Sequence, residues 1–283
     1  MTTIHRSRRT LLRVAALLAA GGSMVLAPGV AFGGSATSSA VPTAGAGGSS
    51  FNPGSAPSGQ CKANFATHRN QVELALSDRV TRLQALQSRV SGVQHLKSSD
   101  VSALSGDLSA QLSGIEELQT KAHSDTTCLQ LFEDAKSMIV DYRVYVVMTP
   151  QVDIVIAADT EAYVEQVLQG LEPKIQRALS ICQSTSATVG GLNCTAAENA
   201  FSQLKAHVST AAQVTSTGGN GESISSAVLA AKPSGYPANR SIGTTAFSAT
   251  RQAQADLLAA RADLETLVGI ARSAKLGGAK GTA

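Results

Sequence analysis

The residues of this chain that could carry catalysis or hold a metal are few and scattered. The histidines are His5, His68, His95, His123 and His207, and none has a second histidine or a cysteine three or four residues away. That spacing is what places two metal ligands on one helical face. His68 and His123 could share a metal at one end of an antiparallel helix pair, but solvated surface histidines are the simpler interpretation. We therefore expect no metal site.

Acidic residues flank an apolar run in the middle of the chain. Asp141 and Arg143 precede it, and Asp153 and Asp159 follow. A buried acid here would serve as a general acid or base, whereas the simpler expectation is that these side chains face water or pair along a helix. Met138 lies on an apolar stripe, where methionine is a core residue more often than a haem ligand.

Other catalytic patterns are missing from the sequence. It contains no Gly-x-Ser-x-Gly elbow, no Ser-x-x-Lys with supporting motifs and no glycine-rich loop ending in Lys-Ser or Lys-Thr. We therefore expect a protein that is not an enzyme, with no catalytic residues and no bound cofactor.

The N-terminus has the order of a signal peptide. Basic residues at positions 6–9 are followed by an apolar stretch at 11–26 and by small residues around Ala31 and Gly33. Residues 7–13 read SRRTLLR, which resembles the twin-arginine export motif, although general secretory signals also contain paired arginines. The apolar stretch is shorter than the roughly 20 residues of a membrane-spanning helix. We expect cleavage after Gly33 or Ala36 and a mature chain that is secreted or associated with the cell envelope and has no transmembrane segment.

Charge and composition constrain the mature chain further. The net charge of +3 comes from the four arginines of residues 1–33. The rest of the chain has 19 basic and 20 acidic residues, which argues against a basic surface for nucleic acid. Residues 34–60 carry no charge and are dominated by Gly, Ser, Ala, Pro and Thr, which predicts a flexible linker. With no Trp and 4% aromatic residues, a core must be built from aliphatic side chains. We expect a helical-bundle domain over 61–275 and a disordered tail over 276–283.

Apolar residues recur at helical spacing over most of that domain. One helix is expected from Lys62 to Gly92, a second begins with Ser98 or Ser99 as its cap, and a third begins near Thr126 or Thr127. The third helix is expected to bury Leu129, Phe132, Ala135, Met138, Ile139 and Tyr142.

Residues 143–158 are ambiguous because they are rich in β-branched side chains. They could form two strands around Pro150, but no tight-turn residues and no further strand support a sheet. We favour a helix kinked at Pro150, so that residues 127–181 form one long helix. Later helices are expected from Thr195, which opens a capping box with Glu198, and over roughly 244–274 with Leu257 and Leu258 inward.

This layout predicts an all-α fold, an elongated antiparallel bundle in which two three-helix bundles share the long kinked helix. Two segments resemble recurrent stretches of a loosely defined family of secreted, Ala-rich helical proteins of actinobacteria, whose function is not known. Residues 141–151 read DYRVYVVMTPQ, and residues 233–239 read PSGYPAN. The resemblance implies an all-helical fold and export. It supplies no catalytic residues, and the four cysteines look particular to this chain.

The helix layout also selects a disulfide pattern. Four cysteines in an exported chain point to two bridges. Cys61 and Cys128 begin the first and third helices, which start at the same end of the bundle, and Cys182 and Cys194 flank the turn at residues 190–191. We predict the bridges Cys61–Cys128 and Cys182–Cys194, since a crossed pairing would span a long helix and exceed the Cα separation of about 4.4–6.8 Å that a disulfide tolerates. Four free buried thiols are the alternative.

These observations lead to one main functional hypothesis and two alternatives. The main hypothesis is a secreted or envelope-associated, non-enzymatic helical module that acts as a spacer or as an interaction surface for an unknown protein or envelope partner. The first alternative is a carrier of a small ligand or lipid in a cavity between helices. An extracellular enzyme is the second, and it requires a pocket where acids or histidines converge.

Overall fold

A computed structural model describes residues 59–185, 193–217 and 222–277, and within them the fold is all-α with no strand. The predicted signal peptide, almost all of the predicted linker and most of the predicted tail lie outside the described residues. The described chain divides into two compact units. The N-terminal unit comprises residues 59–156 and 225–247, and the C-terminal unit comprises 157–224 and 248–277. Helices α6 and α9 contribute residues to both.

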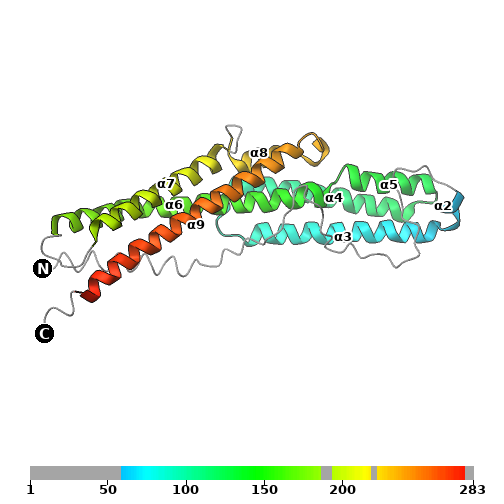
Figure 1. Ribbon diagram of the computed structural model, residues 1–283. Helices are drawn as coiled ribbons and strands as arrows, with labels where there is room; N and C mark the ends of the chain where they lie inside the picture. Colours follow the sequence, from blue (N-terminus) through cyan, green and yellow to red (C-terminus); the bar gives the residue numbers. More distant parts are fainter. Residues whose placement is uncertain (1–58, 186–192, 218–221, 278–283) are drawn as a thin grey trace. The chain divides into compact units, whose positions relative to one another are not determined.

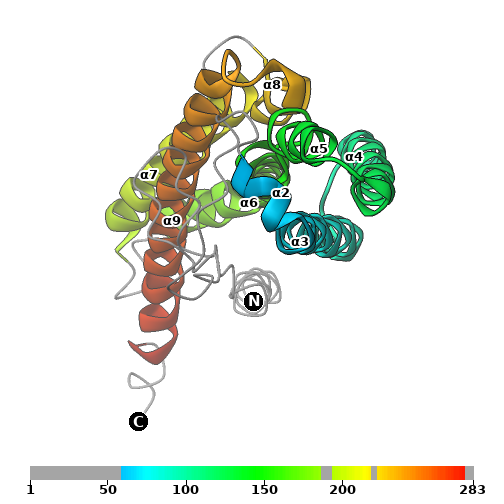
Figure 2. The same ribbon diagram turned by 90° about the vertical axis from the view of Figure 1, so that its right-hand side faces the viewer.

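The N-terminal unit begins with four helices, α2 (Gly59–Ala63), α3 (Phe65–Gly92), α4 (Ser98–Ser124) and α5 (Cys128–Val140). Helices α3, α4 and α5 pack against one another (Figures 1 and 2). Their aliphatic residues recur every three or four positions, so that one stripe of each helix is buried. The most deeply buried include Leu76, Leu83, Leu86, Leu104, Leu108, Ile115 and Leu131.

Some helix caps in this unit are the residues predicted from the sequence, and others are not. Thr127 caps α5, accepting from Gln130 N while the Gln130 side chain accepts from Thr127 N in a capping box. By contrast, Ser98 is the first residue of α4 and Lys97 precedes it without a side-chain cap, so neither Ser98 nor Ser99 is the cap we expected.

After α5 the chain forms a π-helical turn, η1 (Val144–Met148), and then the long helix α6 (Thr149–Thr185). Residues 144–158 are therefore helical as predicted and the two strands are excluded, while the long helix predicted over 127–181 is present with a break at residues 141–143. The kink predicted at Pro150 is wrong in position: the break lies earlier, at Arg143, whose φ of 38° is left-handed. Pro150 is the second residue of α6 and follows η1 closely, so its missing N–H falls at the junction of the two helices.

The C-terminal unit is a three-helix core built from α6, α7 (Cys194–Thr217) and α9 (Arg240–Gly277), which follow one another in Figure 1 from yellow-green to red. Its buried residues are mainly leucine and alanine, including Leu168, Leu204, Ala211, Ala253, Ala260 and Leu264. The cap of α7 is Asn193, whose side-chain oxygen accepts from Ala196 N at 3.0 Å, and not the predicted Thr195.

Three leucine or isoleucine side chains that we expected to be buried are exposed. Leu129 is 55% exposed, Ile139 41% and Leu258 57%. Ile139 and Leu258 directly follow Met138 and Leu257, which are buried. Successive helical residues project about 100° apart, so only one member of each adjacent pair faces the core.

Both predicted disulfides are present. Cys61 joins Cys128 with Cα atoms 6.2 Å apart, and Cys182 joins Cys194 with Cα atoms 6.0 Å apart. The first links the short helix α2, rather than the predicted start of the first long helix, to the first residue of α5. The second joins α6 to the first residue of α7.

Candidate binding site

The two segments singled out in the sequence, residues 141–151 and 233–239, meet within the N-terminal unit. Turn η1 packs against η2 (Pro233–Gly235), a short 3-10 helix between α8 (Ile224–Ala230) and α9. The guanidinium carbon of Arg143 lies 4.7 Å from the ring centroid of Tyr236, within the range of a cation–π interaction. Gln151 Nε2 donates to the carbonyl of Val228 at 3.0 Å.

The backbone around Arg143 is held by helix α3. Thr149 Oγ donates to the carbonyl of Val144 at 3.1 Å, and Arg82 Nε donates to Thr149 Oγ at 3.2 Å. One turn further along α6, Asp153 pairs with Arg89. Burial raises the pKa of Asp153, and Arg89 opposes that rise. These contacts fix the turn in which Arg143 takes its left-handed conformation.

The opposing segment is held by helix α4. Lys232 Nζ donates to both carboxylate oxygens of Asp107 at 2.8 and 2.7 Å. Asn239 Nδ2 donates to the carbonyl of Lys232 at 2.7 Å, which closes the loop that contains Tyr236. Pro233 is buried, while Tyr236 is half-buried. The breaker-rich sequence therefore forms an ordered loop whose aromatic residue faces η1.

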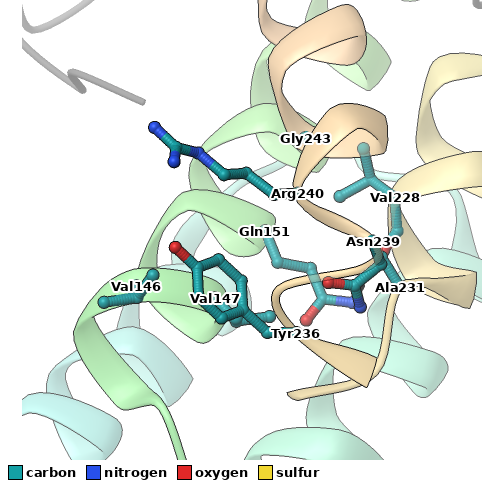
Figure 3. Close-up of a pocket in the computed structure, with 9 residues that line it drawn as sticks. All are labelled: Val146, Val147, Gln151, Val228, Ala231, Tyr236, Asn239, Arg240 and Gly243. Atoms are coloured by element: carbon teal, nitrogen blue, oxygen red, sulfur yellow. Dashed lines mark hydrogen bonds between the residues drawn. The ribbon is translucent and has the colours of Figure 1, made fainter. Parts of the chain in front are cut away.

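A pocket lies between these two segments (Figure 3). It is a small cavity of about 20 Å³, enough for about one water molecule and well below the volume of small-ligand pockets. In Figure 3 the Tyr236 ring lies beside Val147, and the Arg240 side chain extends away from the pocket. All residues that line it belong to the N-terminal unit: Val146, Val147, Gln151, Val228, Ala231, Tyr236, Asn239, Arg240 and Gly243.

The lining of the pocket is apolar apart from a few polar groups. Gln151 is 2% exposed, and its Oε1 has no hydrogen-bond partner. An unsatisfied buried acceptor costs about 1–3 kcal/mol. The pocket therefore has two unfavourable local features, the unpaired acceptor of Gln151 and the left-handed backbone of Arg143. Such features often coincide with functional sites.

Helix α5 and turn η1 also carry exposed apolar side chains. Ile139, Val140, Tyr145 and Val146 are each between 40% and 47% exposed. Arg79 of α3 lies over the Tyr145 ring at 5.2 Å, and burial lowers the pKa of this guanidinium. We call Val140, Tyr145 and Val146, together with the pocket, the η1 surface.

The side chains that the sequence suggested for catalysis or metal binding do not form one site. His123 Nδ1 lies 3.1 Å from Glu73 Oε1. Ser137 Oγ donates to Asp141, and Asp159 is buried in the other unit. In the described ranges no group of three His, Cys, Asp or Glu side chains has an arrangement that could hold a metal ion.

The C-terminal unit contains an unusual buried acid pair. Glu161 and Glu165 on α6 are 3% and 6% exposed, and Thr215 Oγ donates to Glu165 at 3.0 Å. Both carboxyl oxygens of Glu161 lack a hydrogen-bond partner. Burial, with a smaller contribution from the charge of Glu165, raises the pKa of Glu161 to about 9. Glu161 is therefore neutral at pH 7.

No family model, no curated protein and no solved structure matches the chain. A proposal about its function therefore rests on the geometry described above. The sequence drew attention to residues 141–151 and 233–239 but did not identify Tyr236, Asn239 or Arg240 as site residues. The available signal was a cluster of proline, glycine and asparagine around one tyrosine. None of the described helices is both long and apolar enough to cross a membrane.

Proposed function

We propose that this chain is an exported, non-enzymatic helical module that binds a protein of the extracellular space or cell envelope through the η1 surface. The observation that carries the proposal is the convergence of two distant segments on one pocket, where Arg143 is left-handed and stacks on Tyr236 and where Gln151 Oε1 has no hydrogen-bond partner. The signal-peptide pattern and the two disulfides support an oxidising location outside the cytoplasm.

The composition of the η1 surface supports a protein partner. Interfaces are enriched in aromatic residues and arginine relative to the rest of the surface. Here Tyr145 and Tyr236 are each accompanied by an arginine, and Val146 offers an aliphatic contact beside them. An aromatic ring held by a neighbouring guanidinium loses little conformational freedom when a partner covers it.

We further propose that the long helices act as a spacer. Helix α6 has 37 residues, which corresponds to about 55 Å at 1.5 Å per residue. A rigid helix of this length would act as the spacer. Small-angle scattering that gave the radius of gyration of a compact sphere would contradict this part of the proposal.

The alternative, a carrier of a small ligand or lipid, has weaker support from the pocket. A carrier encloses most of its ligand, whereas a cavity of about 20 Å³ is too small for a lipid tail or another small ligand. The discriminating observation is the absence or presence of a bound small molecule in mass spectra of protein purified from its natural source.

A matched pair of double variants tests the proposed function. Val146→Ser with Arg240→Glu alters the η1 surface, and Val167→Ser with Arg177→Glu makes the same chemical changes at exposed positions of the C-terminal unit. Size fractionation of extracellular and envelope material should place the unaltered chain and the control in a larger complex, and the η1 variant in the free fraction. If all three chains fractionate alike, the η1 surface has no partner and the proposal is wrong.

A further inference from the structure

Two aspartates of the N-terminal unit meet where helix α4 ends and α5 packs against it. Asp125 is the residue that ends α4, and Asp134 lies on α5. Their carboxyl groups are in hydrogen-bond contact with each other. Asp125 is 7% exposed and Asp134 is half-buried, and each has a buried Oδ2 that no N–H or hydroxyl group in the described part of the chain reaches. If both groups were ionised, two acceptors would face each other without a donor.

The charges around this pair do not neutralise it. On α4, Lys121 attracts Asp134 but pairs with Glu117 at 3.2 Å, and on α5 Glu133 adds a repulsive charge. The other titratable residues at this end of the unit contribute to the pKa of neither aspartate; they are His123 of α4, Lys62 of α2, and His68, Arg69 and Glu73 of α3. A proton is therefore the available means of relieving the repulsion.

The environment of the pair assigns that proton to Asp125. Burial is the main cause that raises the pKa of Asp125 to about 6, and the charge of Asp134 and the hydrogen bond to it add to the rise. Burial also raises the pKa of Asp134, whereas Lys121 and the hydrogen bond with Asp125 lower it. Asp125 is thus the donor and the Asp134 carboxylate the acceptor. A hydroxyl group that donates to a carboxylate forms a short and strong hydrogen bond.

We infer that Asp125 and Asp134 form a proton-dependent latch, which ties the end of α4 to α5 in mildly acidic surroundings and loosens near neutral pH. With the proton present, one carboxyl group donates to the other across the two helices. Without it, two carboxylates repel each other in a partly buried contact. The Cys61–Cys128 bridge holds the first residue of α5 whether the latch is closed or open. The unit therefore stays folded when the latch opens, and the latch does not depend on a partner at the η1 surface.

Amide hydrogen exchange of the full, disulfide-bonded chain tests the latch. The closed state holds its proton up to about pH 6, whereas the open state releases it near the ordinary pKa of 3.8, so closure is favoured below pH 6 and loses this advantage above it. After correction for intrinsic exchange rates, amides of the last turn of α4 and of α5 should be about tenfold better protected at pH 5 than at pH 7. Asp125→Asn keeps a donor for Asp134 but cannot ionise, so its protection should change less than twofold. Asp78→Asn, at an exposed position of α3, is the matched control and should behave as the unaltered chain.

A second measurement needs no variant and follows the carboxyl carbon signals of the unaltered chain by NMR. The signal of Asp125 should titrate near pH 6, and that of Asp134 should respond in the same range. Three results would overturn the inference. Asp125 could titrate near its ordinary value of 3.8, or the amides of α4 and α5 could be equally protected at pH 5 and pH 7. Calcium chloride at about 5 mM could restore the protection at pH 7 in the unaltered chain but not in Asp125→Asn, which would show a cation site in place of a proton latch.

Discussion

Arg143 adopts a left-handed backbone conformation and places its guanidinium 4.7 Å from the centroid of the Tyr236 ring. A left-handed conformation costs a residue with a Cβ atom roughly 1–2 kcal/mol, so a glycine at this position would form the turn with less strain. The stacking of Arg143 on Tyr236, which holds the aromatic side chain at the pocket, is the structural reason for an arginine at this place.

The conformation of Arg143 predicts an order of stability for two variants. Arg143→Gly and Arg143→Ala both lose the contact with Tyr236, but only alanine keeps a Cβ in the left-handed region. The alanine variant should unfold at lower urea concentration, with a free energy of unfolding up to about 1 kcal/mol below that of the glycine variant. Circular dichroism measures this directly. An alanine variant as stable as the glycine variant would show that φ at this position is not fixed.

Close packing on helix α4 predicts opposite effects for two glycines. A Cβ at Gly114 would lie 2.3 Å from a ring carbon of Tyr142, whereas nothing lies within 4 Å of a Cβ at Gly106. Gly106→Ala should stabilise the chain by about 1 kcal/mol through helix propensity, and Gly114→Ala should destabilise it by about 1–3 kcal/mol through overpacking. The destabilisation should vanish when Tyr142→Leu is added. Thermal unfolding of the four chains decides whether the ring is the cause.

Burial of Glu161 predicts a dependence of stability on pH. Its pKa is raised from 4.5 to about 9 in the folded chain, so the folded state binds a proton that the unfolded state releases above about pH 4.5. The stabilisation is fully present below that pH and is lost as the pH rises through about 9. Glu161→Gln should remove this dependence, so that the variant is the more stable chain at pH 8. Glu172→Gln on the same helix is the control. Identical pH profiles for both variants would refute the interpretation.

The two disulfides should contribute unequally to stability. They close loops with sequence separations of 67 and 12 residues. Loop-closure entropy then gives about 4 kcal/mol for Cys61–Cys128 and about 3 kcal/mol for Cys182–Cys194. Replacing each pair with serines and measuring urea unfolding tests the order. A larger loss from the shorter bridge would mean that native-state packing around it outweighs the entropy term.

Helix positions and disulfide partners were predictable because they depend on local periodicity and simple topology. Buried residues such as Leu104, Leu108 and Ile115 recur on one face of a helix, and the helix order then brings Cys61 to Cys128. The break at Arg143 was not predictable, because arginine has no special preference for a left-handed conformation. The sequence instead indicated Pro150, which the first turn of a helix accepts.

The candidate site was less predictable than the fold, because its residues are brought together by tertiary contacts. Gln151 and Val228 are joined by a hydrogen bond across two segments far apart in the chain. Residue spacing in the sequence cannot predict a contact of this kind. What the sequence offered was the unusual character of each segment separately, and only the structure shows that both line one pocket.

Binding of a partner at the η1 surface is tested most directly by a photo-reactive amino acid placed at Val146 in the producing cells. The matched control carries the same amino acid at Leu258, which is 57% exposed on the C-terminal unit. We predict a crosslinked product of one defined size from position 146, none from position 258, and a weaker yield at 146 when Arg240→Glu is present. No product at position 146, or equal products at both positions, would contradict a partner-binding role for the pocket.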